Sequence, residues 1–183
     1  SVTISCMHLI HHRSFGTDAW DFGLYVNTMW RSLHGDLLGC SFLIEGNHAS
    51  RHFDPILILL SPMLLVHRSA ETLLVFQAVW VGSSVFPLYF IAKRRLRSPW
   101  IGFALGAVYA LHPAVHGPNL YDFHSLVIAG PLALWCLHFI EANRMRSFVA
   151  ASLLLMLCRE EMPVITLLLS IYAFMSGRGG RAV

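Results

Sequence analysis

Long apolar runs alternate along this chain with short polar or basic stretches. Between residues 17 and 33 the pattern differs, because apolar side chains recur at helical spacing with polar residues between them. This periodicity predicts an amphipathic helix, with Thr17 or Asp18 as its N-cap. The apolar positions are Phe22, Val26, Met29 and Leu33.

The next two segments do not have the length of a membrane span. Residues 35–51 are polar and contain Gly39, Gly46 and Asn47, which favours a loop. Residues 55–66 are apolar, but they reach only about half of the roughly 20 residues that cross a bilayer, and Pro62 interrupts them. We therefore expect a helix that lies at the membrane interface or enters it partway.

Five longer or more continuous apolar runs follow, and each predicts a membrane helix. The first of them is a full span of the roughly 20 residues required. The stretch from His116 to His124 is polar and predicts the loop between the second and third spans. The expected membrane helices cover residues 70–92, 100–115, 126–140, 147–158 and 162–176.

Three basic clusters give the expected topology. They are Lys93–Arg97, Asn143–Arg146 and Arg178–Arg181, and each follows or precedes an apolar run. Cytoplasmic loops are enriched in Lys and Arg, so all three clusters are expected in the cytoplasm and His116–His124 outside. This assignment requires that residues 55–66 do not span.

Composition supports the same class of protein. The chain has 183 residues, of which 56% are hydrophobic and 13% charged, against about 25% charged in soluble domains; mean hydropathy is +0.60. We expect an all-α, polytopic transmembrane helical bundle at the cytoplasmic membrane, formed by one membrane domain over residues 1–183. Residues 1–12 would be the tail of a preceding helix, and residues 13–69 would form an outer loop with juxtamembrane helices. We expect the chain of 183 residues to be a fragment of a longer protein.

Charge and cysteine content exclude other classes. The net charge of +3 comes mostly from the basic clusters and indicates topology, not nucleic-acid binding. The four cysteines have no metal-ligand spacing and predict no disulfide framework. Motifs for nucleotide phosphates, for hydrolase nucleophiles and for zinc proteases are absent from the sequence.

The acidic residues are distributed unevenly across this topology. Nine of the ten lie in or beside segments expected outside, and only Glu141 lies on the basic side. Most histidines also lie outside, which predicts a site at that face. The nine residues are Asp18, Asp21, Asp36, Glu45, Asp54, Glu71, Asp122, Glu160 and Glu161.

Asp18 and Asp21 stand at the start of the amphipathic helix. Acids in the first turn cap a helix and interact favourably with its dipole. Alternatively, a carboxylate at the membrane surface could act as a general base or a metal ligand. Capping is favoured for Asp18, and both interpretations stay open for Asp21.

His48, His52 and Asp54 form a second cluster before the interfacial helix. A zinc site would need a third firm ligand at suitable spacing, which this run lacks. A polar loop that caps the following helix is the alternative, with Asp54 as N-cap and Pro55 at the first helical position.

Asn119, Asp122 and His124 lie in the short loop between two spans. Ionisable groups at the membrane edge are costly, so Asp122 and His124 are candidates for function. Tyr121 and Phe123 fit the interfacial aromatic belt.

Arg159, Glu160 and Glu161 lie between two apolar runs with almost no loop. Three charges there need partners. Either the Arg and a Glu pair with each other, or one Glu faces a polar cavity.

These motifs, in this order, resemble a family of prokaryotic predicted membrane proteins of unknown function. Its motifs are Thr-x-x-Phe-Asp-Leu-Gly-x-x-x-Gln-x-x-Trp, His-Phe-x-Pro, Gly-Ala-Asn-x-Phe-Asp-Phe-His-Pro and Lys-Glu-Asp. The similar segments here are Thr17–Trp30, His52–Pro55, Gly117–Ser125 and Arg159–Glu161. The departures are Asn27 for Gln, Ser125 for Pro and Arg159 for Lys.

More distantly, the layout resembles membrane glycosyltransferases of the GT-C type, such as protein mannosyltransferases and aminoarabinose transferases, which use lipid-phosphate sugars. The resemblance implies that Asp21 is the catalytic carboxylate or a metal ligand, with Mg²⁺ or Mn²⁺ as a possible cation. Residues implied to bind the donor or a metal are His52, Asp122, His124, Glu160 and Glu161. Supporting positions are Asp18, Asn119 and Arg159.

Two functions of different classes follow. The first is a glycosyltransferase that takes a polyprenyl-phosphate sugar from the bilayer at the outer face of the cytoplasmic membrane. The second is a non-catalytic polytopic protein, either a transporter or a lipid-binding envelope component. Transporters place ionisable residues near the bilayer midplane, whereas these motifs are expected at the outer edge, which favours the first function.

Overall fold

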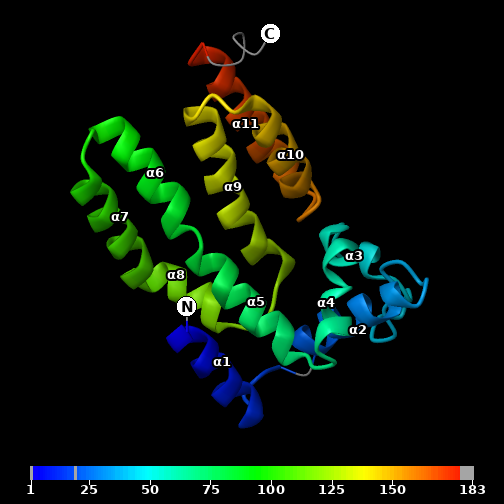
Figure 1. The fold of residues 1–183 in the computed structure, drawn as a ribbon. Coiled ribbons are helices and arrows are strands. Elements are labelled where there is room, and N and C mark those ends of the chain that lie inside the picture. The colour runs from blue at the N-terminus through cyan, green and yellow to red at the C-terminus, as the bar shows by residue number, and fades with distance from the viewer. Residues whose placement is uncertain (1, 19, 178–183) are drawn as a thin grey trace.

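The computed structural model describes residues 2–18 and 20–177, and these residues form helices without any β-strand (Figure 1). The all-α prediction is therefore confirmed for them. The basic cluster predicted at Arg178–Arg181 lies outside the described residues.

The N-terminal helix and the amphipathic helix lie at the same end of the molecule. Helix α1 (Val2–Arg13) packs against α5. Helix α2 (Asp21–Leu33) begins four residues later than predicted, and neither Thr17 nor Asp18 caps it, because Trp20 occupies the N-cap position without a side-chain bond. Asp18 instead accepts a hydrogen bond from the Trp20 N–H at 2.7 Å, which forms a turn just before the helix.

The predicted loop is followed by helical structure over most of residues 55–66, and one predicted cap is wrong. A 3-10 turn, η1 (His48–Ser50), precedes two short helices, α3 (Ile56–Leu60) and α4 (Met63–Val66), with Pro62 at the break between them. Asp54 does not cap α3 with its side chain, so that prediction was wrong. Its carboxylate turns into the protein interior and is fully buried.

One segment has the length and apolarity of a membrane span. Helices α5 (Glu71–Gly82) and α6 (Val85–Leu96), separated only by Ser83 and Ser84, together form a segment of 26 residues. Among the described residues it is the sole segment that meets both criteria. The basic residues at its end lie in the last turn of α6, where cations interact favourably with the helix dipole.

The predicted outer loop is largely helical. Helix α7 (Pro99–Leu111) ends at Leu111, and α8 (Pro113–Leu120) follows after His112, so residues 116–120 of the predicted loop 116–124 are helical. The His112 side chain caps α8 by accepting from the Ala114 N–H at 3.2 Å, and Pro113 fits the first turn because that position needs no N–H donor.

Three helices complete the chain: α9 (Ser125–Glu141), α10 (Met145–Met156) and α11 (Met162–Met175). They have 17, 12 and 14 residues, and α7 has 13. All four are shorter than the roughly 20 residues that cross a bilayer without tilt or thinning. The five predicted spans are thus present as apolar helices, but only the first has spanning length.

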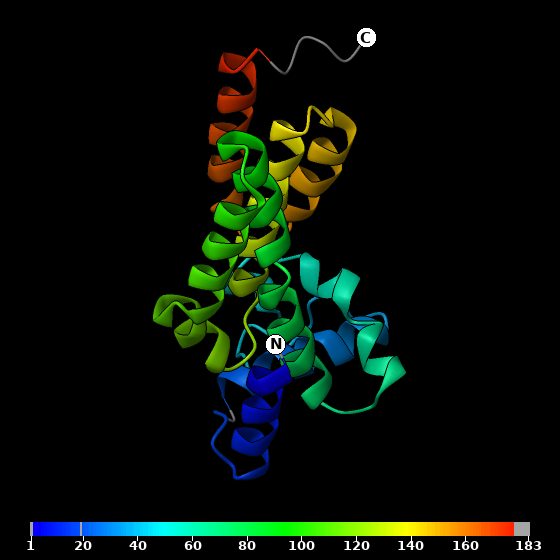
Figure 2. The ribbon, with the colours of Figure 1, turned by 60° about the vertical axis from the view of Figure 1, so that its left-hand side comes forward.

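The long helices run between two ends of the molecule (Figures 1 and 2). The C-terminal ends of α6, α9 and α11 lie together at one end, and α2, α3 and the start of α9 lie toward the other. At the first end, Arg95 contacts Glu141 at 2.6 Å and Tyr172, which ties α6, α9 and α11 together. Glu141, the one acid expected on the basic side, therefore lies among basic residues.

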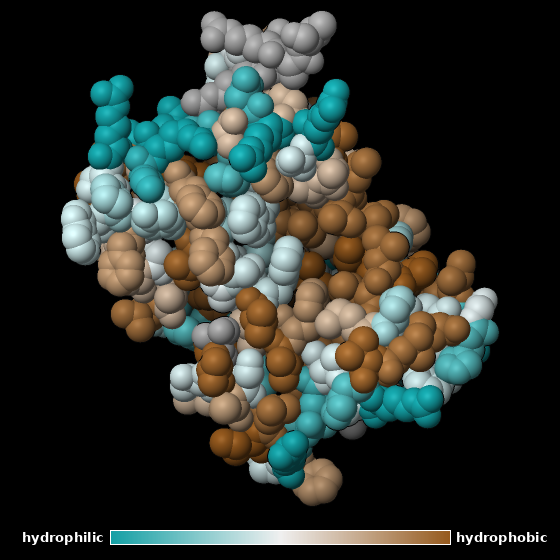
Figure 3. All heavy atoms as spheres, viewed as in Figure 1, coloured by the Kyte–Doolittle hydropathy of each residue, from teal (hydrophilic) through white to brown (hydrophobic). Residues whose placement is uncertain are grey.

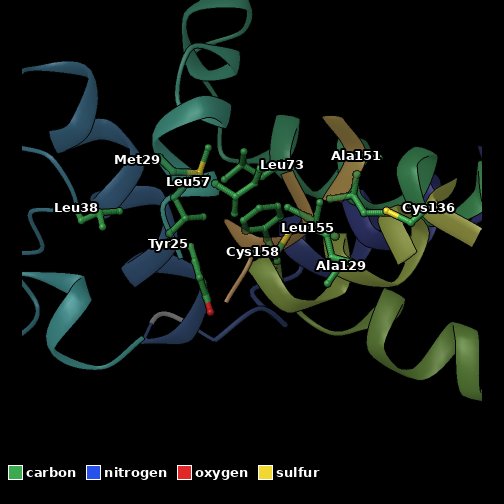
Figure 4. Close-up of a cluster of buried hydrophobic side chains, with 14 of the residues drawn as sticks. Tyr25, Met29, Leu38, Leu57, Leu73, Ala129, Cys136, Ala151, Leu155 and Cys158 are labelled. Carbon is green, nitrogen blue, oxygen red and sulfur yellow. The ribbon is translucent and has the colours of Figure 1, made fainter. Parts of the chain in front are cut away.

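One buried apolar cluster joins α2 and α3 to the bundle (Figure 4). Met29 from α2, Leu57 from α3, Leu73 from α5 and Leu155 from α10 are almost completely buried in it. The Ile56 N–H also donates to the Leu157 carbonyl at 2.9 Å, which fixes α3 to the end of α10. Cys40, Cys136 and Cys158 are buried free thiols, as expected of packing residues.

Apolar side chains cover much of the flank of the bundle, whereas hydrophilic residues gather at the end where α6 and α9 finish (Figure 3). Large apolar residues on α7 and α11 are strongly exposed, including Phe103 at 67% and Leu167 at 59%. Soluble proteins rarely expose contiguous apolar surface of this kind, so these helices require a lipid or protein environment.

Candidate functional site

Segments that are far apart in the sequence enclose one polar cavity of about 340 Å³. Its walls come from the start of α2, the region of η1, the residue before α9 and the turn between α10 and α11. The described residues that line it are Trp20, Asp21, Leu24, Tyr25, Leu43, His48, Arg51, His52, His124 and Arg159.

Asp21 is the only acid among the described residues that line this cavity. It is the first residue of α2, where the helix dipole stabilises a negative charge. The Tyr121 hydroxyl donates to Asp21 Oδ2 at 3.0 Å, and this contact with a carboxylate raises the pKa of Tyr121. Asp21 is half-buried, so one carboxylate has both a fixed partner and access to the cavity.

His52 lies between two charged residues of the α10–α11 turn. Its Nδ1 is 3.0 Å from Glu160 Oε1, and Arg159 Nη2 approaches the same ring to 2.8 Å at Nε2. The Phe53 N–H also donates to Glu160 Oε2 at 2.9 Å. The bond to His52 and those to backbone N–H groups lower the pKa of Glu160 to about 2, so this carboxylate is ionised at neutral pH.

His124 directly precedes α9 and also lines the polar cavity. Its Nδ1 is 2.8 Å from the Asp122 carbonyl, and its ring packs against Tyr25 and Tyr121 with centroid distances of 5.2 Å each. Gln77 holds this turn from α5: its Oε1 accepts from the His124 N–H at 3.1 Å, and its Nε2 donates to the Tyr121 carbonyl at 3.3 Å. The orientation of His124 therefore depends on a residue inside the bundle.

A buried pair lies behind the cavity wall. His48 Nε2 is 2.9 Å from Asp54 Oδ1, without linear hydrogen-bond geometry, and both side chains are at most 2% exposed. Ser125 Oγ donates to the other carboxylate oxygen of Asp54 at 2.6 Å. A carboxylate without solvent needs such partners, so Asp54 joins η1 to α9 from inside.

The remaining predicted residues lie outside the cavity. Asp122 is buried, and its Oδ2 accepts from the Asp18 N–H at 2.7 Å, so it fixes the chain before α2. Asn119 is 1% exposed within α8. Glu161 is at the surface, 3.5 Å from Arg159 Nε.

The structure thus brings Asp21, His52, His124 and Arg159 to one cavity, with Glu160 bound to its rim. Sequence reasoning missed Arg51 and Tyr25, and it assigned His48 to a polar loop although this side chain is buried in the wall. Burial raises the pKa of Tyr25, so its hydroxyl stays protonated at neutral pH. The only feature of the sequence that could have indicated His48 as a lining residue was its proximity to His52.

The chemistry of the lining suits an anion. Arg51 and Arg159 carry permanent positive charge. Guanidinium groups match the geometry of phosphate oxygens. In the part of the chain that the structure describes, no three His, Cys, Asp or Glu side chains converge as a metal site.

A larger cavity of about 950 Å³ lies on the other side of α2 and is a weaker candidate. Its walls are mostly apolar, and its charged groups have partners: Arg13 binds Glu71 at 2.8 Å, and Asp18 binds the Trp20 N–H. Volume alone does not make a site when polar groups do not converge in it.

Comparison with known proteins gives one match. A family model described as "Predicted membrane protein (DUF2079)" matches residues 11–182. No curated protein and no solved structure matches the chain.

Proposed function

We propose a function from the premise that this chain belongs to the DUF2079 family of predicted membrane proteins. The function is transfer of a sugar from a polyprenyl-phosphate donor to an acceptor hydroxyl, at the outer face of the cytoplasmic membrane. The observation that carries it is the polar cavity in which Arg51, Arg159 and His52 face Asp21, beside helices with exposed apolar surfaces.

The donor phosphate would bind to the basic side of the cavity. Arg159 and Arg51 supply charged donors for its oxygens, whereas Nδ1 of His52 already contacts Glu160 and Nδ1 of His124 the Asp122 carbonyl. The Arg159 side chain is 16% exposed, so its charge is only partly screened by solvent. Glu160 would keep His52 in place at the rim.

Asp21 would act on the acceptor. Its carboxylate takes the proton of the acceptor hydroxyl while the hydroxyl oxygen bonds to the anomeric carbon of the sugar. The bond between that carbon and the phosphate oxygen breaks, and the electron pair leaves with polyprenyl phosphate. The positive side chains stabilise the charge that develops on this leaving group. A divalent cation at Asp21 would supply the same stabilisation.

The proposed orientation follows from charge. By the positive-inside rule, the basic residues at the end of α6 and Arg144 between α9 and α10 would face the cytoplasm. The cavity lies toward the opposite end, where α2 and the start of α9 meet, and would therefore open to the outside.

Cysteine labelling in intact cells tests this orientation. In a Cys6→Ser background, a membrane-impermeant maleimide should modify Glu45→Cys, in the loop after α2, but not Arg94→Cys at the end of α6. Glu45 and Arg94 are both exposed, so a cysteine at either position can react. A cysteine at Asn119 in α8 would be too buried to report on which side of the membrane it lies. Permeabilised cells provide the control, because both cysteines should then react. The reverse labelling in intact cells would place the cavity inside and overturn the proposed donor side.

Turnover tests the activity itself. Protein in lipid nanodiscs should release polyprenyl phosphate from at least one member of a panel of polyprenyl-phosphate sugars, in the presence of a membrane extract as acceptor. EDTA in a parallel reaction shows whether a divalent cation is required. Binding of these lipids without release from any of them would instead favour a lipid-binding envelope component.

A further inference from the structure

A second cavity, of about 350 Å³, adjoins the polar cavity. The two share His124 and Arg159, which stand in the wall of both. The second cavity lies between the end of α8 and the first turn of α9, and its other lining residues are Gly117, Pro118, Tyr121, Leu126 and Val127.

The two cavities differ in chemistry. The first holds most of the charged and imidazole side chains, whereas the second is lined mainly by aliphatic and small residues beyond the shared pair. Leu126 is 43% exposed and begins α9, an apolar helix. The second cavity therefore opens at the apolar flank and ends at two basic side chains.

Gly117 is exposed at the edge of this second cavity. A Cβ atom built at Gly117 would have no atom within 4 Å, so the space above this glycine is empty. Pro118 follows it inside α8 and adds apolar ring surface without a backbone N–H donor. An apolar guest could lie here without leaving a buried N–H unpaired.

We propose that the second cavity binds the first isoprenoid units of a polyprenyl phosphate, with the phosphate at the junction formed by His124 and Arg159. This inference rests on the proposed function and adds the place and direction of the lipid chain. The occupant follows from continuity with the anion-binding cavity: a ligand with a charged head and a hydrocarbon chain matches both compartments at once. The chain would leave toward the bilayer between α8 and α9.

Filling the second cavity tests the inference. In nanodiscs, Gly117→Trp should weaken binding of a long-chain polyprenyl monophosphate roughly tenfold, the loss expected when about two methylene groups lose their contacts. It should leave the affinity for methyl phosphate, which has no isoprene unit, nearly unchanged. Leu126→Asn, which makes the wall polar without adding bulk, should act in the same direction.

Gly130→Trp is the matched control. Gly130 is also an exposed glycine inside a helix, and a Cβ there likewise meets no atom within 4 Å, but it lines neither cavity. This variant should bind both probes like the parent protein. Equal long-chain affinity for the parent and Gly117→Trp would overturn the inference, as would equal weakening by Gly117→Trp and Gly130→Trp.

The result also separates the inference from the function on which it rests. If the parent protein binds long-chain and short-chain phosphates and the filled variants do so equally, only the location of the chain is wrong. If the parent protein binds neither probe, nor inorganic phosphate, the proposed donor class is wrong and the inference falls with it.

Discussion

Replacing Asp21 by Asn should lower the rate of sugar transfer by about 10² to 10⁴-fold, the usual contribution of a positioned general base. The amide keeps the size of the side chain and can still accept a hydrogen bond from Tyr121. It loses the negative charge that proton removal or cation binding requires. Release of polyprenyl phosphate, measured per molecule of folded protein in nanodiscs, gives the rate.

Two variants serve as controls for Asp21→Asn. Asp18→Asn should keep most of the activity, because Asp18 only accepts from the Trp20 N–H and does not line the polar cavity. Tyr121→Phe removes the hydroxyl partner of Asp21 but leaves its charge, so its effect should be intermediate. If Asp18→Asn and Asp21→Asn reduce expression equally and leave the rate per molecule unchanged, Asp21 has only a structural role.

The helices of the bundle could be predicted because their apolar runs are long and their ends carry strong signals. Helix α9 begins within one residue of the predicted start, and α11 begins at the predicted residue. Pro62 breaks the interfacial helix as expected, since proline lacks the N–H that a helix interior needs. Such features depend on local backbone chemistry, which a single sequence contains.

The errors have a common physical origin in tertiary contacts. The polar stretch around Asn119 was predicted to be a loop, but Gln77 from α5 donates to the backbone carbonyls of Asn119 and Tyr121. Asp54 has the sequence features of an N-cap, yet its carboxylate binds Ser125 from α9. Neither partner lies near in the sequence, so local propensity gave the wrong outcome at both places.

The candidate site could be predicted only in part for the same reason. Asp21, His52 and His124 were identifiable as polar residues beside apolar segments, and they line one cavity. Arg51 resembles an ordinary loop residue in the sequence, and nothing local distinguishes Asp122, which binds a backbone N–H, from Asp21, which faces the cavity. The roles of two similar carboxylates depend on which one the fold leaves accessible.

The buried pair behind the cavity should dominate stability. Removing the Asp54 carboxylate leaves two buried polar groups without their neighbour, each at a cost of about 1 to 3 kcal/mol, so Asp54→Ala should cost about 2 to 6 kcal/mol of folding free energy. His48 would lose its acidic neighbour, and the Ser125 hydroxyl would lose its acceptor, both away from solvent. Reversible unfolding of the purified protein in mixed micelles measures the loss.

Glu71→Ala is the matched control for Asp54→Ala. It also removes an acid from a pair, but its partner Arg13 lies at the surface with a side chain that is 69% exposed. Exposed pairs contribute little, so this variant should unfold nearly like the parent protein. The Asp54→Ala, His48→Ala double variant should lose less than the sum of its two single variants, since neither polar side chain then remains without the other in the interior. Additive losses would mean that the two side chains do not stabilise each other, and that Asp54 is held by Ser125 alone.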